Sequence, residues 1–311
     1  MATDPDAFTS AEEDMYPQVA AVRTALRAED WPGAQAQFDD QPADVRTRLI
    51  RFGAHREFRP FLQKTVADHP GDTAAVAMLG DLMTKDAWAV RSNQRARHVS
   101  AEQFAQFHAM LAETERMLGE STAVDPTDPA VWVSRLVVAR GLELGLSEAR
   151  RRYARLADLD PHHLSGQSQL LQQLCPKWGG TFDELHAFAR EAMRAAPAGA
   201  HNAVLVADAH LEHAIDESGQ ANRYLSGIRG ELMEAAERSV FHPAFQRTVG
   251  WVDVCQTFAF VLVLAGEKQA AARLFEATGP YIGNNPWQYY PDPRKMFHDT
   301  RKRAARKFRL W

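Results

Sequence analysis

Several features that define common classes of protein are missing from this sequence. Only two of its 311 residues are cysteines, Cys175 and Cys255, which argues against a disulfide framework and suits a reducing cytosol. The most apolar run, Phe258 to Ala265, is far shorter than the roughly 20 residues that a transmembrane helix needs. The first residues are acidic and polar, unlike a signal peptide. We therefore expect a soluble, cytoplasmic protein.

Charge and motifs argue against further classes. The formal net charge is −4, so the whole chain has no bias toward nucleic acid or anionic membranes. No segment matches a phosphate-binding loop, a GxSxG nucleophile elbow or the zinc motif HExxH, and two cysteines cannot form a zinc-binding cysteine cluster. Alternating runs bounded by turn pairs, which indicate strands, are almost absent. We expect no cofactor, and no enzyme class is indicated.

The clearest local signal lies in residues 174–192, LCPKWGGTFDELHAFAREA. Pro176 should end the preceding helix, because the residue before a proline is pushed out of the helical region. The two glycines that follow allow a sharp turn. Thr181 and Glu184 have the spacing of a capping box, and apolar residues then recur at helical spacing. This stretch predicts a helix end, a rigid turn and a new helix.

The rest of the chain shows helical patterns separated by proline turns. Three of these turns, at Pro126, Pro161 and Pro197, lie about one 34-residue helical hairpin apart. We predict an all-α fold, an irregular solenoid of antiparallel helix hairpins. Residues 1–9 should be disordered, residues 10–293 should form one helical-repeat domain, and residues 294–311 should form a basic C-terminal capping helix.

Two segments resemble the second helix of tetratricopeptide (TPR) repeats. The matching positions are Ala149, Tyr153 and Pro161 in the first segment, and Gly266, Glu267, Ala270, Leu274 and Phe275 in the second. The motif's first helix matches poorly, although Trp132 is present. The TPR-like pattern is clearest over 120–280, and it implies a helical-repeat fold.

The chain is also similar to an uncharacterised family of bacterial TPR-like proteins with a Lys-Trp-Gly-Gly motif. The residues that carry this similarity are Trp88 with Arg91, the Asp-Pro pairs, the run Lys177, Trp178, Gly179 and Gly180, and the run Ala209, His210, Leu211 and Glu212. No activity is assigned to that family, so the similarity transfers no catalytic residues.

The strongest polar cluster falls on the helix predicted from about 200 to 216. Helical spacing places Asp208 and Glu212 on one face, and His210 and His213 on another. Glu212 could serve as a general base. In the alternative interpretation, which we favour, His210 packs between helices with its ring N–H on a carbonyl, while His213 and Asp208 are solvated.

A metal site at the same helix is a further hypothesis. His210 and His213 could be two ligands, with His186 or His163 from a neighbouring hairpin as the third. This histidine spacing is common in any long helix, so we expect no tightly bound transition metal.

Two pairs, each of a tryptophan and a basic residue, are candidates for ligand binding. Trp178 could stack on a ligand while Lys177 neutralises its carboxylate or phosphate. A tryptophan beside two glycines more often closes a hydrophobic gap at a hairpin elbow, and we favour that role. For Trp88 and Arg91 we similarly favour an interhelix anchor with a buried ion pair.

The tail has basic residues on an amphipathic pattern from 294 to 309. Such a helix can bind anionic lipid or nucleic acid. It is more often a cap whose apolar side covers the last repeat, and Phe297 and Phe308 would supply that side.

Together these patterns predict a cytoplasmic helical-repeat protein that binds or scaffolds a peptide, protein or small ligand on a concave face. This rests on analogy of fold. The alternative is an enzyme of unrecognised type, with a pocket between Lys177/Trp178 and His210/Glu212. A scaffold should show an open groove, and an enzyme should show a closed pocket with convergent polar groups and shifted pKa values.

Overall fold

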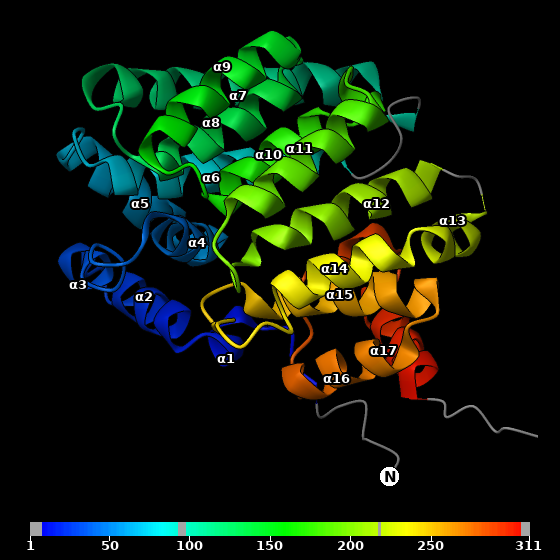
Figure 1. Cartoon of the computed structure of the whole chain (residues 1–311). Helices are drawn as coiled ribbons and strands as arrows, with labels where there is room; N and C mark the ends of the chain where they lie inside the picture. The colour runs from blue at the N-terminus through cyan, green and yellow to red at the C-terminus, as the bar shows by residue number, and fades with distance from the viewer. Residues whose placement is uncertain (1–7, 93–97, 217–218, 306–311) are drawn as a thin grey trace, which may run out of the picture. The chain divides into compact units, whose positions relative to one another are not determined.

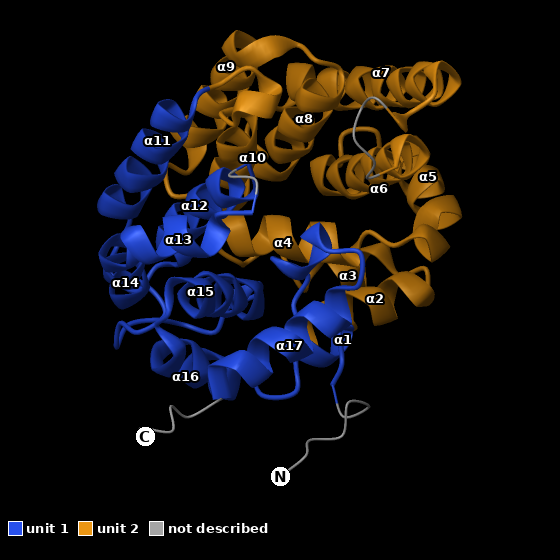
Figure 2. Cartoon of the chain, turned by 90° about the vertical axis from the view of Figure 1, so that its right-hand side faces the viewer, with its two compact units in different colours: residues 1–15, 181–311 blue, residues 16–180 orange. Residues whose placement is uncertain are grey.

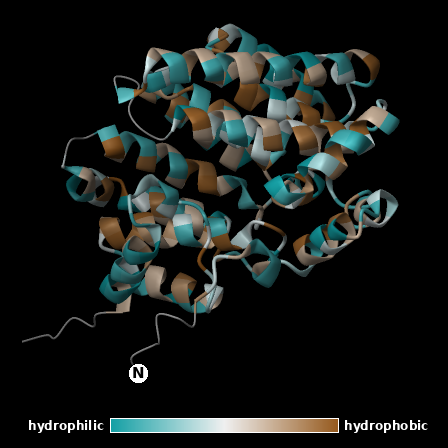
Figure 3. Cartoon of the chain, turned by 180° about the vertical axis from the view of Figure 1, so that it is seen from behind, coloured by the Kyte–Doolittle hydropathy of each residue, from teal (hydrophilic) through white to brown (hydrophobic). Residues whose placement is uncertain are grey.

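The computed structural model describes residues 8–92, 98–216 and 219–305, and it confirms the predicted all-α class. Over these residues the chain forms 17 α-helices joined by turns and short 3₁₀ segments (Figure 1). The β-structure in this part of the chain is one isolated bridge between Thr9 and Tyr281. Hydrophobic and hydrophilic residues alternate around single helices (Figure 3), as amphipathic helices require.

The chain divides into two compact units (Figure 2). One comprises residues 16–180, and the other joins residues 1–15 to residues 181–311. We call them the 16–180 unit and the 181–311 unit. The division falls directly after the Lys-Trp-Gly-Gly turn, and the single helical-repeat domain predicted over 10–293 stays a prediction.

The 16–180 unit contains nine of the helices, in chain order. They are α2 (Pro17–Arg27), α3 (Trp31–Gln35), α4 (Ala43–Gly53), α5 (Arg59–Asp68), α6 (Thr73–Arg91), α7 (Ala101–Val124), α8 (Pro129–Gly141), α9 (Gly145–Leu159) and α10 (Leu164–Gln173). Ser100 and Gln103 form the capping box at the start of α7 that their spacing predicts. Consecutive helices from α6 to α10 pack against each other, as hairpins do.

Helix α4 departs from a simple stack of hairpins, because it packs against α6, α8 and α10. Buried polar contacts fix this arrangement. The Asp44 carboxylate accepts a hydrogen bond from the Ser165 backbone N–H at 2.7 Å, and the Thr47 hydroxyl lies 3.0 Å from His163 Nε2. In a solenoid each hairpin touches only adjacent ones, so the solenoid arrangement is not confirmed.

The 181–311 unit contains the other eight helices. They are α1 (Glu12–Met15), α11 (Phe182–Ala195), α12 (Val204–Asp216), α13 (Ala221–Gly227), α14 (Arg229–Arg238), α15 (Trp251–Ala265), α16 (Lys268–Thr278) and α17 (Pro293–Ala305). Helix α15 carries the apolar run and is buried along almost its whole length, packed against α12, α13, α14 and α16. It is therefore a core helix, and no helix in the described part of the chain is both long and apolar enough to cross a membrane.

The two ends of the described chain meet in this unit. The Phe8 and Phe297 rings lie 5.5 Å apart, and Arg294 Nη2 donates to the Phe8 carbonyl at 3.0 Å. The Thr9 backbone N–H donates to the Pro280 carbonyl at 3.0 Å. Residues 1–9 were predicted to be disordered, but Phe8 and Thr9 are held here. Residues 1–7 lie outside the described residues.

Candidate functional site

The capped helix predicted after the Lys-Trp-Gly-Gly turn places one histidine of the candidate site. The Thr181 hydroxyl accepts a hydrogen bond from the Glu184 backbone N–H at 3.2 Å, so Thr181 is the N-cap of α11. This start fixes which face of α11 packs on α12. His186 lies on that inner face with Leu185 and Ala189, and it is buried.

Helix α12 supplies two more histidines, which lie three residues apart and on one face. His210 is 2% exposed, and His213 is partly exposed. The hydroxyl oxygen of Tyr224, on α13, lies 2.7 Å from His210 Nδ1 and 2.9 Å from His213 Nδ1. His186 Nε2 lies 3.0 Å from His213 Nδ1 and 3.4 Å from the same hydroxyl. We call these four residues the histidine–tyrosine cluster.

A carboxylate and a guanidinium extend the cluster on the side of His210. His210 Nε2 lies 3.2 Å from the Glu231 carboxylate, which belongs to α14. Arg190 donates to both oxygens of the same carboxylate, at 2.5 and 3.1 Å. Such a two-pronged pair fixes the direction of the carboxylate. Arg190, Glu231, His210 and Tyr224 therefore form one continuous polar chain across four helices.

The surroundings keep two of these histidines neutral. Burial, together with the neighbouring His210, His213 and Arg190, lowers the pKa of His186 from 6.5 to about 3. Burial also lowers the pKa of His210, although Glu231 opposes the shift. A neutral imidazole has one N–H donor and one lone pair. At neutral pH these rings can therefore relay protons or offer lone pairs.

The opposite face of α12 is acidic and faces the loop before α17. Asp208 Oδ1 accepts a hydrogen bond from Asn285 Nδ2 at 3.2 Å, and Glu212 Oε1 accepts one from the Tyr289 hydroxyl at 2.9 Å. Asp253 accepts from the Asn285 backbone N–H at 2.9 Å. Burial, together with the charges of Glu212 and Asp253, raises the pKa of Asp208 to about 7, although the hydrogen bond from Asn285 opposes the shift.

These contacts bear on the prediction that His210 and Glu212 line the same pocket. The two side chains contact different neighbours, Glu231 and Tyr224 for His210 and Tyr289 for Glu212. They therefore belong to different faces of α12, as the helical spacing predicted. The favoured interpretation was wrong in two details. His210 Nε2 contacts a carboxylate and not a backbone carbonyl, and Asp208, expected to be solvated, has a pKa raised by burial.

The predicted aromatic residues meet in the 16–180 unit. The Trp178 ring packs edge-on against Trp88 with centroids 6.2 Å apart, and the Arg140 guanidinium lies 6.0 Å from the Trp178 centroid. Arg91 lies over the Trp88 ring at 5.5 Å. The Lys177 side chain is exposed and Trp178 is partly exposed. Sequence analysis named Trp88 with Arg91 and Lys177 with Trp178 as two separate pairs, and it missed Arg140.

The turn that holds Trp178 depends on its glycines. Gly179 has φ +91°, a left-handed conformation that favours glycine. A Cβ on Gly180 would collide with the carbonyl oxygen of Leu174. The Trp178 carbonyl also accepts a hydrogen bond from Gln173 Nε2 at 2.9 Å. The rigid turn predicted from the sequence is present, as the 3₁₀ segment Pro176–Trp178.

The proposed pocket between Lys177/Trp178 and His210/Glu212 draws on both units. Lys177 and Trp178 belong to the 16–180 unit, and His210 and Glu212 belong to the 181–311 unit. His163, considered as a third metal ligand, also belongs to the 16–180 unit. The single-pocket hypothesis therefore stays a prediction.

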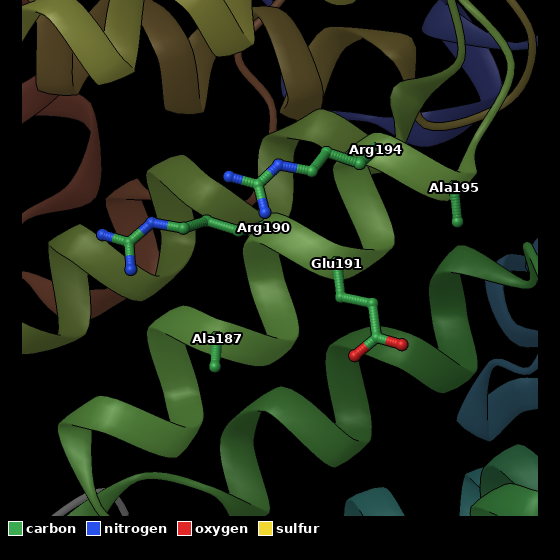
Figure 4. Close-up of a pocket in the computed structure, with 5 residues that line it drawn as sticks. All are labelled: Ala187, Arg190, Glu191, Arg194 and Ala195. Atoms are coloured by element: carbon green, nitrogen blue, oxygen red, sulfur yellow. The ribbon is translucent and has the colours of Figure 1, made fainter.

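An open hollow lies on the face of α11 that carries Arg190 (Figure 4). Its volume is about 720 Å³, and it is lined by Ala187, Arg190, Glu191, Arg194 and Ala195. Arg190 and Arg194 project from the same side of the helix in Figure 4. Arg190 thus lines the hollow and also binds Glu231, which in turn contacts His210 of the histidine–tyrosine cluster.

Within the described residues, no group of three or more His, Cys, Asp or Glu side chains is arranged to hold a metal ion. Comparisons with protein-family models, curated proteins and solved structures found no match. The roles of residues must therefore be argued from geometry. Tyr224 and Glu231 were missed by sequence analysis, because a single tyrosine and a single glutamate in polar helical segments carry no motif.

Proposed function

We propose that the chain is a cytoplasmic helical-repeat binding protein, and that the exposed face of α11 receives a carboxylate-bearing segment of a peptide partner. The observation that carries this proposal is the open hollow on α11. Its alanines leave space beside the helix, and Arg194 offers a planar, forked donor that matches a carboxylate.

Charge on this face favours an acidic ligand. Arg194 is exposed, and neither a hydrogen bond nor an ion pair joins it to another described residue. Arg190 is anchored by Glu231, so one of the two guanidinium groups is held in place before a ligand arrives. Glu191 reduces the positive charge of the hollow but leaves a net charge of +1 among its lining side chains. Because the Arg190 side chain is already ordered, less side-chain entropy is lost when a ligand binds.

A fluorescein-labelled poly-glutamate peptide tests the proposal by fluorescence anisotropy at low salt. The wild-type chain should bind, and the Arg194→Glu variant should bind much more weakly. Arg229→Glu is the matched control, because it makes the same charge change at an exposed arginine of the same unit. Equal losses in both variants, or no binding by the wild type, would contradict a specific site on α11.

An enzymatic role is the second candidate, and the chain Glu231–His210–Tyr224 favours it. A carboxylate, an imidazole and a hydroxyl in that order can activate the hydroxyl. The Tyr224 oxygen, however, already has three imidazole nitrogens within 3.4 Å. The hydroxyl is therefore enclosed by imidazole nitrogens, whereas the open hollow lies on the exposed face of α11. Binding is the better supported function.

A further inference from the structure

Three atoms of the histidine–tyrosine cluster form a closed triangle. His186 Nε2 lies 3.0 Å from His213 Nδ1, the Tyr224 oxygen lies 2.9 Å from His213 Nδ1, and the third side, from that oxygen to His186 Nε2, is 3.4 Å. The three residues come from α11, α12 and α13. Each of the three atoms can offer a lone pair.

This triangle has the dimensions of one face of a metal coordination shell. Metal–nitrogen and metal–oxygen bonds of about 2.1 Å place neighbouring ligand atoms roughly 3.0 Å apart in an octahedron and roughly 3.4 Å apart in a tetrahedron. We propose that His186, His213 and Tyr224 bind a divalent first-row transition metal ion of the zinc and copper class. This inference goes beyond the proposed peptide site and does not depend on it.

The choice of Tyr224 as third ligand follows from where His210 lies. His210 Nδ1 lies 2.7 Å from the Tyr224 oxygen. His210 therefore contacts a ligand atom and is not itself a ligand. The described residues hold no metal-binding group built from His, Cys, Asp and Glu alone. A phenolate supplies the third donor, and imidazole nitrogens suit zinc, copper, iron and nickel.

The proton of the phenol has a defined acceptor. When the metal–oxygen bond forms, the Tyr224 O–H bond breaks and its proton moves to His210 Nδ1, which leaves a phenolate and an imidazolium. Glu231, 3.2 Å from His210 Nε2, stabilises that positive charge. In the bound form His186 Nε2 and His213 Nδ1 turn their lone pairs to the metal, so the ring protons lie on the nitrogens outside the triangle. No oxidant or reductant is needed.

The residues around the triangle also suit this role. Outer partners that hold ligand groups in position are a regular part of metal sites. Here Arg190 orients Glu231, and Glu231 contacts His210.

Equilibrium dialysis of the full chain against zinc, followed by elemental analysis, tests the site. The wild type should retain one zinc ion per chain, and His213→Ala and Tyr224→Phe should lose it. His69→Ala, at an exposed histidine of the other unit, should retain it. Retention of zinc in both cluster variants, or no zinc in the wild type, would overturn the proposal.

A second measurement needs no variant that could fail to fold. Copper(II) added to the wild-type chain should produce a visible phenolate-to-copper charge-transfer band, because Tyr224 would be a direct ligand. A copper complex without that band would rule out the tyrosine as a ligand.

Glu231→Gln should weaken zinc binding by roughly 10–100-fold, the range for outer partners of metal ligands. Unchanged zinc affinity in that variant would contradict the proton transfer to His210.

Discussion

At the scale of single residues, the structure favours a packing role for Trp178. Its ring contacts Trp88 and lies near Arg140, while Lys177 beside it is exposed. Trp178 thereby packs against an aromatic ring and lies near a cation within the 16–180 unit, while the closing of a hairpin elbow stays a prediction. Recognition of a ligand by the exposed part of the ring stays a hypothesis.

Replacing Trp178 with alanine should lower the free energy of unfolding by roughly 1–3 kcal/mol, because the ring loses its aromatic partner and part of its buried area. A fully buried tryptophan would cost about 3–5 kcal/mol, and this ring is partly exposed. Lys177→Ala should change stability by less than about 0.5 kcal/mol. Urea unfolding of both variants checks the difference, and equal stability of Trp178→Ala and wild type would refute the packing role.

Asp208 should make stability depend on pH in a defined direction. Its pKa is raised from 3.8 to about 7 in the folded chain, so the folded state binds more protons than the unfolded state between these values. The contribution of Asp208 to the free energy of unfolding is therefore present at low pH and is lost as the pH rises toward and past about 7. Asp208→Asn should therefore gain stability relative to wild type between pH 5 and pH 8.

Thermal melts of wild type and Asp208→Asn across this pH range measure the effect. Asp183→Asn removes a carboxylate from an exposed position on α11 and serves as the control. A difference between wild type and Asp208→Asn that stays constant with pH would show that Asp208 is not held in its protonated form.

At the scale of helices, α17 behaves as part of the core of the 181–311 unit. Phe297 is 1% exposed and packs against Phe275 and Trp287 with ring centroids 5.7 and 5.4 Å away. Exposed basic residues cover the other side of the helix. Helix α17 is described as far as Ala305, and the capping role predicted for residues 294–311 stays a prediction. Phe308 lies outside the described residues.

Removing the Phe297 side chain should destabilise the chain strongly. Phe297→Ala leaves a cavity among aromatic rings and should cost about 3–5 kcal/mol. Arg303→Ala, on the exposed side of α17, should cost less than about 0.5 kcal/mol. Urea unfolding measures both variants. A Phe297→Ala chain as stable as wild type would instead favour a tail whose role lies in binding anions.

Local signals predicted the helices better than the site. The Thr181 cap and the shared face of His210 and His213 follow from spacing along one helix, and both are confirmed. Glu231 and Tyr224 reach this face only because α13 and α14 pack nearby, and such contacts leave no periodic pattern in the sequence. The packing of α4 against α10 and the division after Gly180 are long-range features of the same kind.

At the scale of the whole molecule, the cluster links protonation to folding. The pKa of His186 falls from 6.5 in the unfolded chain to about 3 in the folded one. The unfolded state then binds more protons between these pH values. The contribution of His186 to the free energy of unfolding is therefore present above about pH 6.5 and is lost as the pH falls toward 3. Asp208 acts in the opposite direction over part of the same range.

The most direct test of the account is an NMR titration of the histidine rings in the full chain. If His186, His210 and His213 surround Tyr224 as described, His186 should stay neutral well below pH 6.5, while the exposed His69 serves as the internal reference. Replacing Tyr224 by phenylalanine should shift the ring signals of all three cluster histidines. A His186 ring that titrates near 6.5, and does not respond to Tyr224→Phe, would contradict the cluster and the metal site built on it.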